Sequence, residues 1–481
     1  MADTALTVEQ QRRLAEIVAV YPVADELGQR FDAAGHQLYL VGGTVRDTLL
    51  GRIQQDLDFA TSALPEQTKS VLEGWADNIW LTGARFGTIS AHKGEAKMEI
   101  TTFRAEVYEP GSRHPAVTYG EDIETDLSRR DFTINAMAVR LPDHLFVDPF
   151  GGLADLRRLL LRTPLDPEIS FSDDPLRMVR LARFAAVLGA SADEGTLKAA
   201  GAMADSLASI SRERIRDELN RLLVSPKPAH GMDLLCETGL AGQFLPEIPA
   251  LRMERDPLHH HKDVYAHTLA VVERCAPAED LVLRLAALLH DIGKPATRRF
   301  HSGGKVSFHH HEEVGARMAQ ARLRELRYSG AVIDQVCQLI ALHLRFHGYA
   351  EGEWTDSAVR RYVRDAGAPE QLRRLNELTR ADVTTRNRAK ALRLADAMTD
   401  LEERIARLAV EEETAKVRPA LDGNQIMEHL KLEPGPLVGE ARAMLLEARL
   451  DRGPMSEDEA RQLLDEWARE GALRAIDGPD P

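Results

Sequence analysis

The sequence contains few cysteines, no long apolar run and no overall excess of positive charge. Its three cysteines, Cys236, Cys275 and Cys337, lie far apart and form no CxxC pair, so we expect free thiols in a reducing compartment. No segment reaches the roughly 18 apolar residues of a membrane span. The polar start "MADTALTVEQQRRLAEIV" has no apolar signal-peptide core. These absences predict a cytoplasmic protein without a membrane partner.

Negative charge prevails, with a formal net charge of −15 at pH 7. Such a protein is not expected to coat nucleic acid nonspecifically. Between residues 317 and 393, however, 15 Lys and Arg stand against 9 Asp and Glu. A local basic surface within an acidic protein therefore stays compatible with the composition.

The chain has 481 residues, 44% of them hydrophobic, which is too long for one ordinary domain. Strand and helix patterns alternate until about residue 150, and helical periods dominate from residue 172 to the end. We find no internal repeat and no low-complexity segment. The pattern predicts an α+β head of about 160 residues followed by a helical body.

Several short segments of the head have clear local signals. Alternation and β-branched residues predict strands at "YLV", "LDFAT", "TISAH" and "MEITTFR". "TVRDTLLG" is typical of a helix that ends at Gly51, and "PEQTKSVLEGWA" of a helix that begins at proline. Residues 1–36 are predicted to be helical.

Two aspartates, Asp56 and Asp58, stand two residues apart in "DLDF". On a strand they face the same side, where the like charges repel unless a cation lies between them. Carboxylate oxygens at this spacing suit Mg²⁺. An isolated DxD is more often a solvated strand edge, so this pair needs a second signal.

The second signal is "GGTVRD", directly upstream. Gly42 and Gly43 let the backbone approach an anion closely at a helix start, and Arg46 offers a two-pronged contact to phosphate. A glycine turn followed by DxD predicts a nucleoside triphosphate on the turn, bridged by Mg²⁺ to the aspartates.

These residues resemble the signature of the class II tRNA nucleotidyltransferase and bacterial poly(A) polymerase family. Further motifs follow in that family's order: "EITTFR", "DLSRRDFTINAMA", "DPFGGLADLRRLLLR", "SDDPLRMVRLARFAA" and "SRERIRDEL". The resemblance spans at least residues 38–250. It implies a polymerase-β-like nucleotidyltransferase head with a small mixed sheet, followed by an all-helical body.

Glu99 lies on a strand that is expected beside "DLDF". A third carboxylate there would activate the 3′-hydroxyl of an RNA primer as a general base, although a surface glutamate is an equally good interpretation. The resemblance implies that Arg130 binds the triphosphate, with Asp131 and Asn135 near the ribose.

In "DDPLRMVRLAR", the spacing predicts that Asp174 and Arg177 lie one turn apart on one helix face, with Arg180 and Arg183 following. In isolation this would be a plain helix ion pair. The resemblance implies that Asp174 and Arg177 read the Watson–Crick edge of the incoming base, and that Arg180 and Arg183 bind the nucleotide. Where the family usually has Glu-Asp, this chain has Asp173-Asp174.

A second set of residues lies in the body, in "YAHTL", "LLHDIGK" and "TRADVTT". His267, His290, Asp291 and Asp382 resemble the metal ligands of the HD phosphohydrolase superfamily, and the resemblance places His311 and His343 at two additional ligand positions. This donor mixture suits Mn²⁺, Ni²⁺, Fe²⁺ or Zn²⁺ better than Mg²⁺. Whether such a site is active stays open.

We therefore expect five regions: an N-terminal helical segment (1–36), the head (37–163), a helical region for nucleobase recognition and RNA binding (164–250), an HD domain (251–390) and a C-terminal helical region (391–481). The expected function is template-independent addition of CCA to tRNA 3′ ends from CTP and ATP. Alternatives are poly(A), CC-only or A-only addition. The resemblance implies a long basic C-terminal extension for the bacterial poly(A) enzymes, whereas the tail of this chain after residue 393 is mixed and acidic, which favours tRNA over poly(A) synthesis.

An alternative from another class is a metal-dependent HD phosphohydrolase with an RNA-binding head. A noncatalytic RNA-binding scaffold is disfavoured, because it would need neither the Asp56/Asp58 pair nor the Asp174/Arg177 pair. The oligomeric state stays open.

Overall fold

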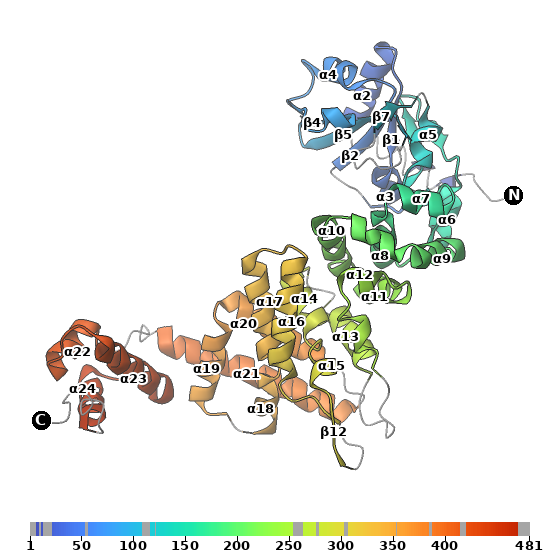
Figure 1. The fold of residues 1–481 in the computed structure, drawn as a ribbon. Coiled ribbons are helices and arrows are strands. Elements are labelled where there is room, and N and C mark those ends of the chain that lie inside the picture. The colour runs from blue at the N-terminus through green and yellow to red at the C-terminus, as the bar shows by residue number, and fades with distance from the viewer. Residues whose placement is uncertain are drawn as a thin grey trace, which may run out of the picture. The chain divides into compact units, whose positions relative to one another are not determined.

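The structure is a computed structural model. It describes residues 6–8, 11–12, 22–52, 56–107, 116–120, 122–253, 263–275, 279–302, 306–352, 354–383, 387–413 and 420–469. The chain divides into two compact units. The first comprises residues 1–253, 276–281 and 322–328, and the second comprises the remainder (Figure 1). Much of the expected N-terminal helical segment lies outside the described residues.

The first unit is built on a seven-stranded mixed sheet with the order β3-β4-β5-β2-β1-β8-β9. β2 and β5 pair in parallel, and the other pairs are antiparallel. The strand bounds are β1 Leu38–Val41, β2 Asp56–Thr61, β3 Asn78–Trp80, β4 Thr88–Lys93, β5 Ala96–Thr102, β8 Ala138–Leu141 and β9 Phe146–Val147. The small mixed sheet of the expected head is thus confirmed.

The alternation of β2 and β5 separates an apolar face from a polar face. Leu57 and Phe59 on β2 are buried, as are Met98 and Ile100 on β5. In the parallel register, Asp58 stands beside Glu99 and Asp56 beside Lys97. The charged side chains therefore share the face that is opposite the core.

Short helices flank this sheet: α2 Pro22–Ala33, α3 Gly43–Leu49, α4 Pro65–Leu72 and α5 Ile123–Ser128. A 3₁₀ turn, η2 Thr133–Asn135, and α6 Gly152–Arg158 complete the head. The strands expected at 39–41, 57–61, 88–92 and 98–104 are present, although the last pauses at Phe103 before β6 Arg104–Val107. The helix that begins at Pro65 ends at Leu72, four residues before its expected end at 76.

Helices follow the sheet within the first unit: α7 Pro167–Asp173, α8 Leu176–Leu188, α9 Glu194–Ala202, α10 Arg212–Leu223, α11 Pro228–Glu237 and α12 Leu240–Phe244. α8 packs against both α10 and α11. Its buried stripe includes Met178, Val179, Leu181 and Ala185. Among these helices, the described residues include two strands of two residues each, β10 Leu160–Leu161 and β11 Ser191–Ala192.

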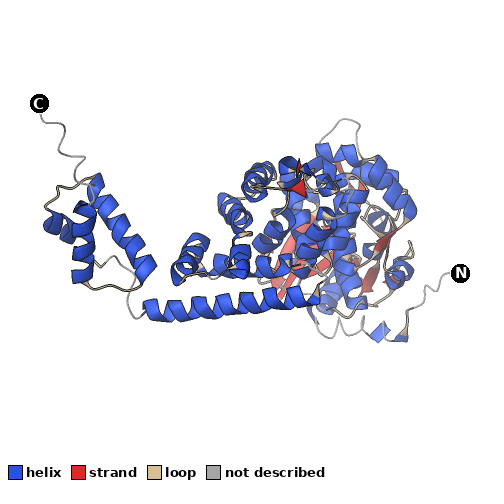
Figure 2. Ribbon diagram, turned by 90° about the horizontal axis from the view of Figure 1, so that it is seen from below, coloured by secondary structure: helices blue, strands red, loops and turns tan. Residues whose placement is uncertain are grey.

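The described residues of the second unit are almost entirely helical. Figure 2 shows this for the part nearest the C-terminus, where helices and loops are drawn and no strand. It contains α13 Val264–Arg274, α15 Lys294–Thr297, α17 Gly330–Leu342, α18 Arg345–Glu351, α19 Asp356–Ala366, α20 Pro369–Asp382 and α21 Arg388–Glu413. It also contains α14 Leu281–Leu289 except its first residue, and α16 His311–Glu325 up to residue 321. A short hairpin pairs β12 Arg299–Phe300 with β13 Val306–Ser307. α22 Gly423–Leu430, α23 Pro436–Arg452 and α24 Glu457–Trp467 share a small core of their own.

Among the described helices, none combines the length and the apolar character that crossing a bilayer requires.

Candidate functional site

The glycine turn joins β1 to α3 and contacts Arg130. Gly42 has φ of 67°, a conformation that L side chains rarely adopt. A Cβ at Gly42 would lie 2.7 Å from Nη1 of Arg130. Gly42 is therefore required both for the turn and for the approach of this guanidinium. The structure thus brings Gly42, Gly43 and Arg130 to one place, as expected of a triphosphate site.

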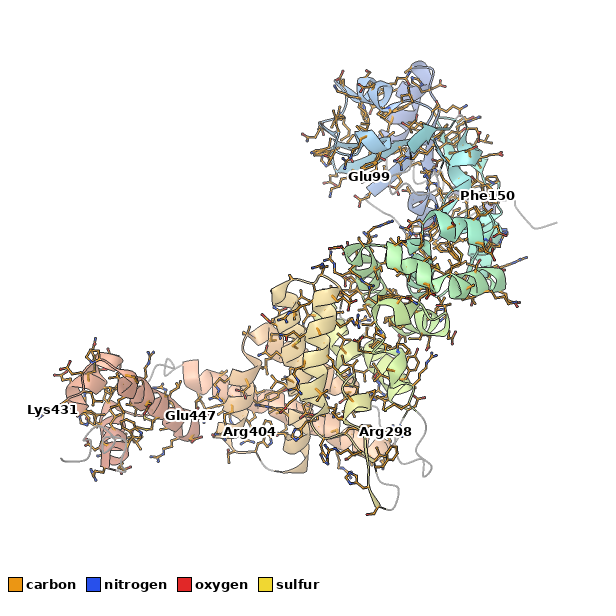
Figure 3. All side chains as sticks on the ribbon, in the orientation of Figure 1. Glu99, Phe150, Arg298, Arg404, Lys431 and Glu447 are labelled. Carbon is orange, nitrogen blue, oxygen red and sulfur yellow. The ribbon has the colours of Figure 1, made fainter. Side chains whose placement is uncertain are left out.

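The carboxylates of Asp58 and Glu99 are neighbours across β2 and β5, and Figure 3 shows Glu99 on this sheet. Burial raises the pKa of Asp58 to about 6, and the negative charges of Glu99 and Asp56 contribute although Arg130 opposes them. The backbone N–H of Asp58 donates to Oγ1 of Thr44, 3.1 Å away. Thr44 thus ties β2 to the first turn of α3, a link that the sequence interpretation missed.

Arg46 is buried, and its guanidinium is already paired within the protein. Nε and Nη2 donate to the two carboxylate oxygens of Asp47, at 2.8 and 2.7 Å. Nη1 donates to Oδ1 of Asn135 at 2.6 Å. A direct contact of this two-pronged group with phosphate therefore stays a prediction, since it would have to replace Asp47.

Asn135 connects Arg46 to the next charged pair. Its amide donates to Oδ1 of Asp131 at 2.8 Å, and Oδ2 of Asp131 accepts from Nε of Arg180 at 2.8 Å. Burial alone would raise the pKa of Asp131, but Arg180 and the Asn135 amide outweigh it and lower the pKa to about 2. Four of the expected nucleotide-binding residues are thus joined in one hydrogen-bonded network across α3, η2 and α8.

Arg180 and Arg183 meet a partner that the sequence interpretation did not name, Glu218 on α10. Its Oε2 lies 2.8 Å from Nε of Arg183, and its Oε1 lies 3.7 Å from Nη1 of Arg180. Glu218 is 5% exposed. Burial lowers the pKa of Arg183 to about 10, and Glu218 opposes this effect. The quoted motif "SRERIRDEL" contains Glu218, so a signal for it was present.

Three guanidinium groups surround the ring of Phe184, which is itself buried. The central carbons of Arg46, Arg180 and Arg183 lie 5.1, 5.7 and 4.1 Å from the ring centroid. The ring packs edge-on against Phe132, with centroids 5.7 Å apart. An aromatic face attracts cations, so Phe184 helps to hold these like charges together.

Arg130 is anchored by Asp126, another residue that was not predicted. Asp126 is 1% exposed and pairs with Arg129 at 2.7 Å and with Arg130 at 3.1 Å. Burial raises its pKa, but the two arginines outweigh burial and lower it. The carboxylate therefore stays charged and holds Arg130 against the glycine turn.

Asp174 and Arg177 do not lie one turn apart on a single helix, so that part of the sequence interpretation is wrong. α7 ends at Asp173, Asp174 is extended with φ of −143°, and α8 begins only at Leu176. The cause is Pro175, because the residue before a proline is driven out of the helical conformation. The break in the helix at Asp174 does not affect the base-reading roles proposed for the two residues.

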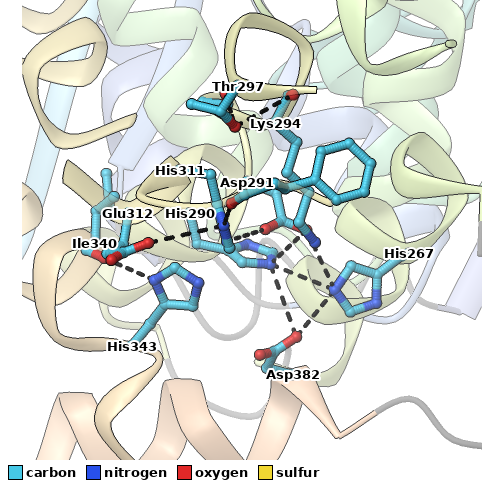
Figure 4. A network of polar contacts seen from close by, with 12 residues as sticks. His267, His290, Asp291, Lys294, Thr297, His311, Glu312, Ile340, His343 and Asp382 are labelled. Carbon is cyan, nitrogen blue, oxygen red and sulfur yellow. Dashed lines mark hydrogen bonds and ion pairs between the residues drawn. The ribbon is translucent and has the colours of Figure 1, made fainter. Parts of the chain in front are cut away.

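The histidines and aspartates of the second unit converge as predicted (Figure 4). Nε2 of His267 lies 2.9 Å from Asp382 and 3.5 Å from Asp291, and Nε2 of His290 lies 3.2 Å from Asp291. The rings of His290 and His343, and those of His311 and His343, have centroids 5.3 Å apart. α13, the end of α14, α16, α17 and α20 each contribute side chains to this cluster.

Two buried atoms of this cluster are oriented as metal ligands would be. Oδ1 of Asp291 and Nε2 of His311 lie 3.3 Å apart, yet neither has a hydrogen-bond partner. Two three-residue groups, His267/His290/Asp291 and Asp291/His311/His343, each have ligand atoms within 4.8 Å of one another. Nδ1 of His290, His311 and His343 each contacts a backbone carbonyl, which fixes the ring orientation. The residues therefore fit a metal centre.

The pKa values in this cluster show how strongly its charges interact. Burial lowers the pKa of His343 to about 3, with His290 contributing, so this ring is neutral and able to act as a ligand. Burial alone would lower the pKa of His290, but Asp291 outweighs it and raises the pKa. Burial alone would raise the pKa values of Asp291 and Asp382, but the surrounding histidines, together with Lys294 beside Asp291, outweigh burial and lower both.

In the head, Asp56, Asp58 and Glu99 do not form a comparable three-ligand group among the described residues. Besides burial, the negative charges of Glu99 and Asp56 raise the pKa of Asp58, and a cation between these carboxylates would relieve their repulsion. Two carboxylates beside the Gly42 turn, where a triphosphate is expected, fit Mg²⁺, which characteristically takes few protein ligands and completes its shell with phosphate oxygens and water.

Three family descriptions match successive parts of the chain. The poly(A) polymerase head domain matches residues 38–162, a probable RNA- and SrmB-binding site of polymerase A matches residues 191–251, and the HD domain matches residues 260–409.

Whole-length relatives agree with this order. The chain is 34% identical over 442 residues to the A-adding tRNA nucleotidyltransferase of Deinococcus radiodurans, covering 90% of this chain and 95% of that one. It is 32% identical over 468 residues to the CC-adding enzyme of Thermus thermophilus, covering 92% and 96%. The structure of the CCA-adding enzyme of Bacillus stearothermophilus with CTP superposes with a TM-score of 0.70 at 27% identity, covering 94% and 99%. The chain therefore belongs to the tRNA nucleotidyltransferase family, whose members transfer nucleotides with a poly(A) polymerase-type head.

Proposed function

We propose that this enzyme adds CCA to tRNA 3′ ends, transferring CMP, CMP and AMP from CTP and ATP with release of pyrophosphate. The observation that carries the proposal is the meeting of the Asp56/Asp58 strand with the Gly42 turn and Arg130 in one head. The relatives named above are A-adding, CC-adding and CCA-adding enzymes, and the nucleotides that this chain incorporates distinguish among these three activities.

In this proposal the head binds and orients the triphosphate. Arg130, held by Asp126, contacts the phosphates at the glycine turn, and Arg180 and Arg183 supply further positive charge. Asp131 and Asn135 lie where the ribose would be held. Bound Mg²⁺ would neutralise the triphosphate and assist departure of pyrophosphate. Asp56 and Asp58 would hold it, and Glu99 would accept the proton of the attacking 3′-hydroxyl.

Asp174 and Arg177 would select the base. Cytosine and adenine each present an amino donor beside a ring-nitrogen acceptor, which matches a carboxylate beside a guanidinium. Uracil and guanine present a carbonyl beside an N–H, which would place oxygen against carboxylate. A buried mismatch costs roughly 1–3 kcal/mol, or about tenfold to a hundredfold in selectivity.

The test is single-nucleotide incorporation into three tRNA transcripts that lack CCA, CA or A, each with one labelled NTP. CCA addition predicts CMP on the first two and AMP on the third. Incorporation on only some transcripts would identify a CC- or A-adding enzyme, and unlimited AMP addition a poly(A) polymerase. Asp56→Ala and Asp58→Ala should abolish every incorporation, and near-normal transfer by either variant in Mg²⁺ would refute the site.

A second activity is favoured by two buried atoms, Oδ1 of Asp291 and Nε2 of His311, that face each other without a hydrogen bond. We propose that the cluster binds a transition metal (Mn²⁺, Ni²⁺, Fe²⁺ or Zn²⁺) and hydrolyses phosphate esters, as the HD superfamily does. Phosphatase and 2′,3′-cyclic phosphodiesterase assays with each metal test this. No hydrolysis with any of them would leave the cluster a binding site without chemistry.

We also propose that the protein acts in the cytoplasm. Its free thiols, Cys236, Cys275 and Cys337, support a reducing compartment.

A further inference from the structure

Arg177 is anchored independently of Asp174. Its Nη1 donates to the carbonyl and the hydroxyl of Ser170, at 3.0 and 2.9 Å, and its Nη2 donates to the carbonyl of Arg129. Arginine has five N–H donors. Three are used here, so the Nε–H and one Nη2–H remain for an incoming base. The donor half of the base-reading pair is thus oriented before any nucleotide arrives.

Asp174 is held by different partners. Its Oδ1 accepts from the backbone N–H of Leu176 at 3.1 Å, at the start of α8. Its Oδ2 accepts from Nη2 of Arg214 at 2.9 Å. A carboxylate oxygen can accept more than one hydrogen bond. Asp174 therefore keeps acceptor capacity for a base amino group while Leu176 and Arg214 fix the plane of its carboxylate.

We infer that Arg214 is a specificity-determining positioning residue, which acts by fixing the Asp174 carboxylate in its base-reading orientation. This inference rests on the function proposed above. It adds that α10 completes the base-selecting pair, because Arg214 on this helix lies 40 residues after Asp174 in the sequence.

The solvent exposure of the Arg214–Asp174 ion pair indicates that it orients the carboxylate and does not stabilise the fold. The side chain of Arg214 is 53% exposed and that of Asp174 is 27% exposed. Ion pairs this accessible add little to folding stability. Loss of Arg214 should therefore leave the protein folded and allow the carboxylate to rotate. A rotated carboxylate no longer opposes the carbonyl of uracil or guanine, so discrimination falls.

The test compares the wild type with Arg214→Gln, Arg214→Lys and a matched control, Arg212→Gln. Arg212 lies on the same helix but contacts the carbonyl of Gln243 and the carboxylate of Glu325. The readout is the ratio of kcat/KM for CTP or ATP to that for UTP or GTP on the same tRNA transcript. We expect Arg214→Gln to lower this ratio about tenfold, Arg214→Lys to lower it less, and Arg212→Gln to leave it unchanged.

A double-mutant cycle shows whether Arg214 acts through Asp174. In an Asp174→Ala background, Arg214→Gln should cause no further loss of selectivity. An equal fall for all four nucleotides, an unchanged ratio, or an additive loss in that background would overturn the inference alone. A wild type without any preference among the four nucleotides would overturn the proposed function as well.

Discussion

Asp58 is difficult to ionise, because it is half-buried beside Glu99 and Asp56. Its pKa is raised from 3.8 to about 6. The folded state therefore binds the proton more tightly than the unfolded chain, and stability falls as pH rises from 3.8 to about 6. Above that range the ionised carboxylate costs roughly 2–3 kcal/mol, which a bound cation would offset.

Asp58→Asn should therefore stabilise the metal-free protein at about pH 7.5 while abolishing transfer. Denaturant unfolding in EDTA should show a gain of roughly 2 kcal/mol at that pH and little gain near pH 4. In the wild type, the Mg²⁺ concentration for half-maximal transfer should rise as pH falls through about 6. A metal requirement independent of pH in this range would show that Asp58 is not a metal ligand.

Thr44 supplies the acceptor for the Asp58 backbone N–H and is 3% exposed. Thr44→Val keeps the shape but leaves that N–H without its partner, at a cost of about 1–3 kcal/mol. We expect kcat to fall about tenfold, because the strand that carries both aspartates is no longer tied to α3. Thr44→Ser keeps the hydroxyl and is the control. Equal rates for the two variants would mean that the hydrogen bond does not position the strand.

At the scale of elements, α8 carries three site arginines and is positioned by its contact with α11. Gly231 on α11 makes this contact, since a Cβ there would lie 2.7 Å from the Ala182 carbonyl and 2.9 Å from Cβ of Ala186. Gly231→Ala should lower the free energy of unfolding by about 1–3 kcal/mol and raise KM for CTP and ATP together.

The control for this change is Gly242→Ala on α12, where no atom lies within 4 Å of the added Cβ. Alanine favours helix over glycine, so this variant should be neutral or up to about 1 kcal/mol more stable. Thermal unfolding and nucleotide titration of both proteins provide the measurements. A stable Gly231→Ala protein with normal KM would show that α8 adapts to a displaced α11.

Elements with a strong local pattern could be predicted from the sequence, and those set by long-range contacts could not. β1, α3 and β2 follow from the alternation of apolar and polar residues and from the positions of the glycines. The Glu99 strand was expected beside "DLDF", and the structure adds that β2 and β5 pair in parallel. The interruption at Asp174 was missed, although Pro175 was visible. Thr44, Ser170 and Glu218 were missed because their roles depend on partners 14, 7 and 35 residues away, which periodicity does not reveal.

At the scale of the whole molecule, the chain has two compact units, each with its own set of charged residues. The head residues lie in the first unit, and His267, His290, Asp291 and Asp382 all lie in the second. The paired change His290→Ala with Asp291→Ala should therefore leave CMP and AMP addition within about twofold of the wild type. The same change should end transition-metal binding and any phosphohydrolase activity.

The reciprocal change completes the comparison. Asp56→Ala should end nucleotide addition but leave the transition-metal content, measured by elemental analysis of purified protein, unchanged. Circular dichroism and thermal unfolding establish that both proteins are folded. Loss of nucleotide addition in a folded His290/Asp291 variant would mean that the two sets of residues are coupled.

The ring of Phe184 restricts which sequences this family member can tolerate. Leucine would fill a similar apolar space, yet it has no π face for the guanidinium groups of Arg46, Arg180 and Arg183. In a saturation library under selection for nucleotide addition, tyrosine or tryptophan should therefore survive at this position far more often than leucine or methionine. One hydrophobic position would then show the mutational intolerance that is ordinarily associated with residues that touch the substrate.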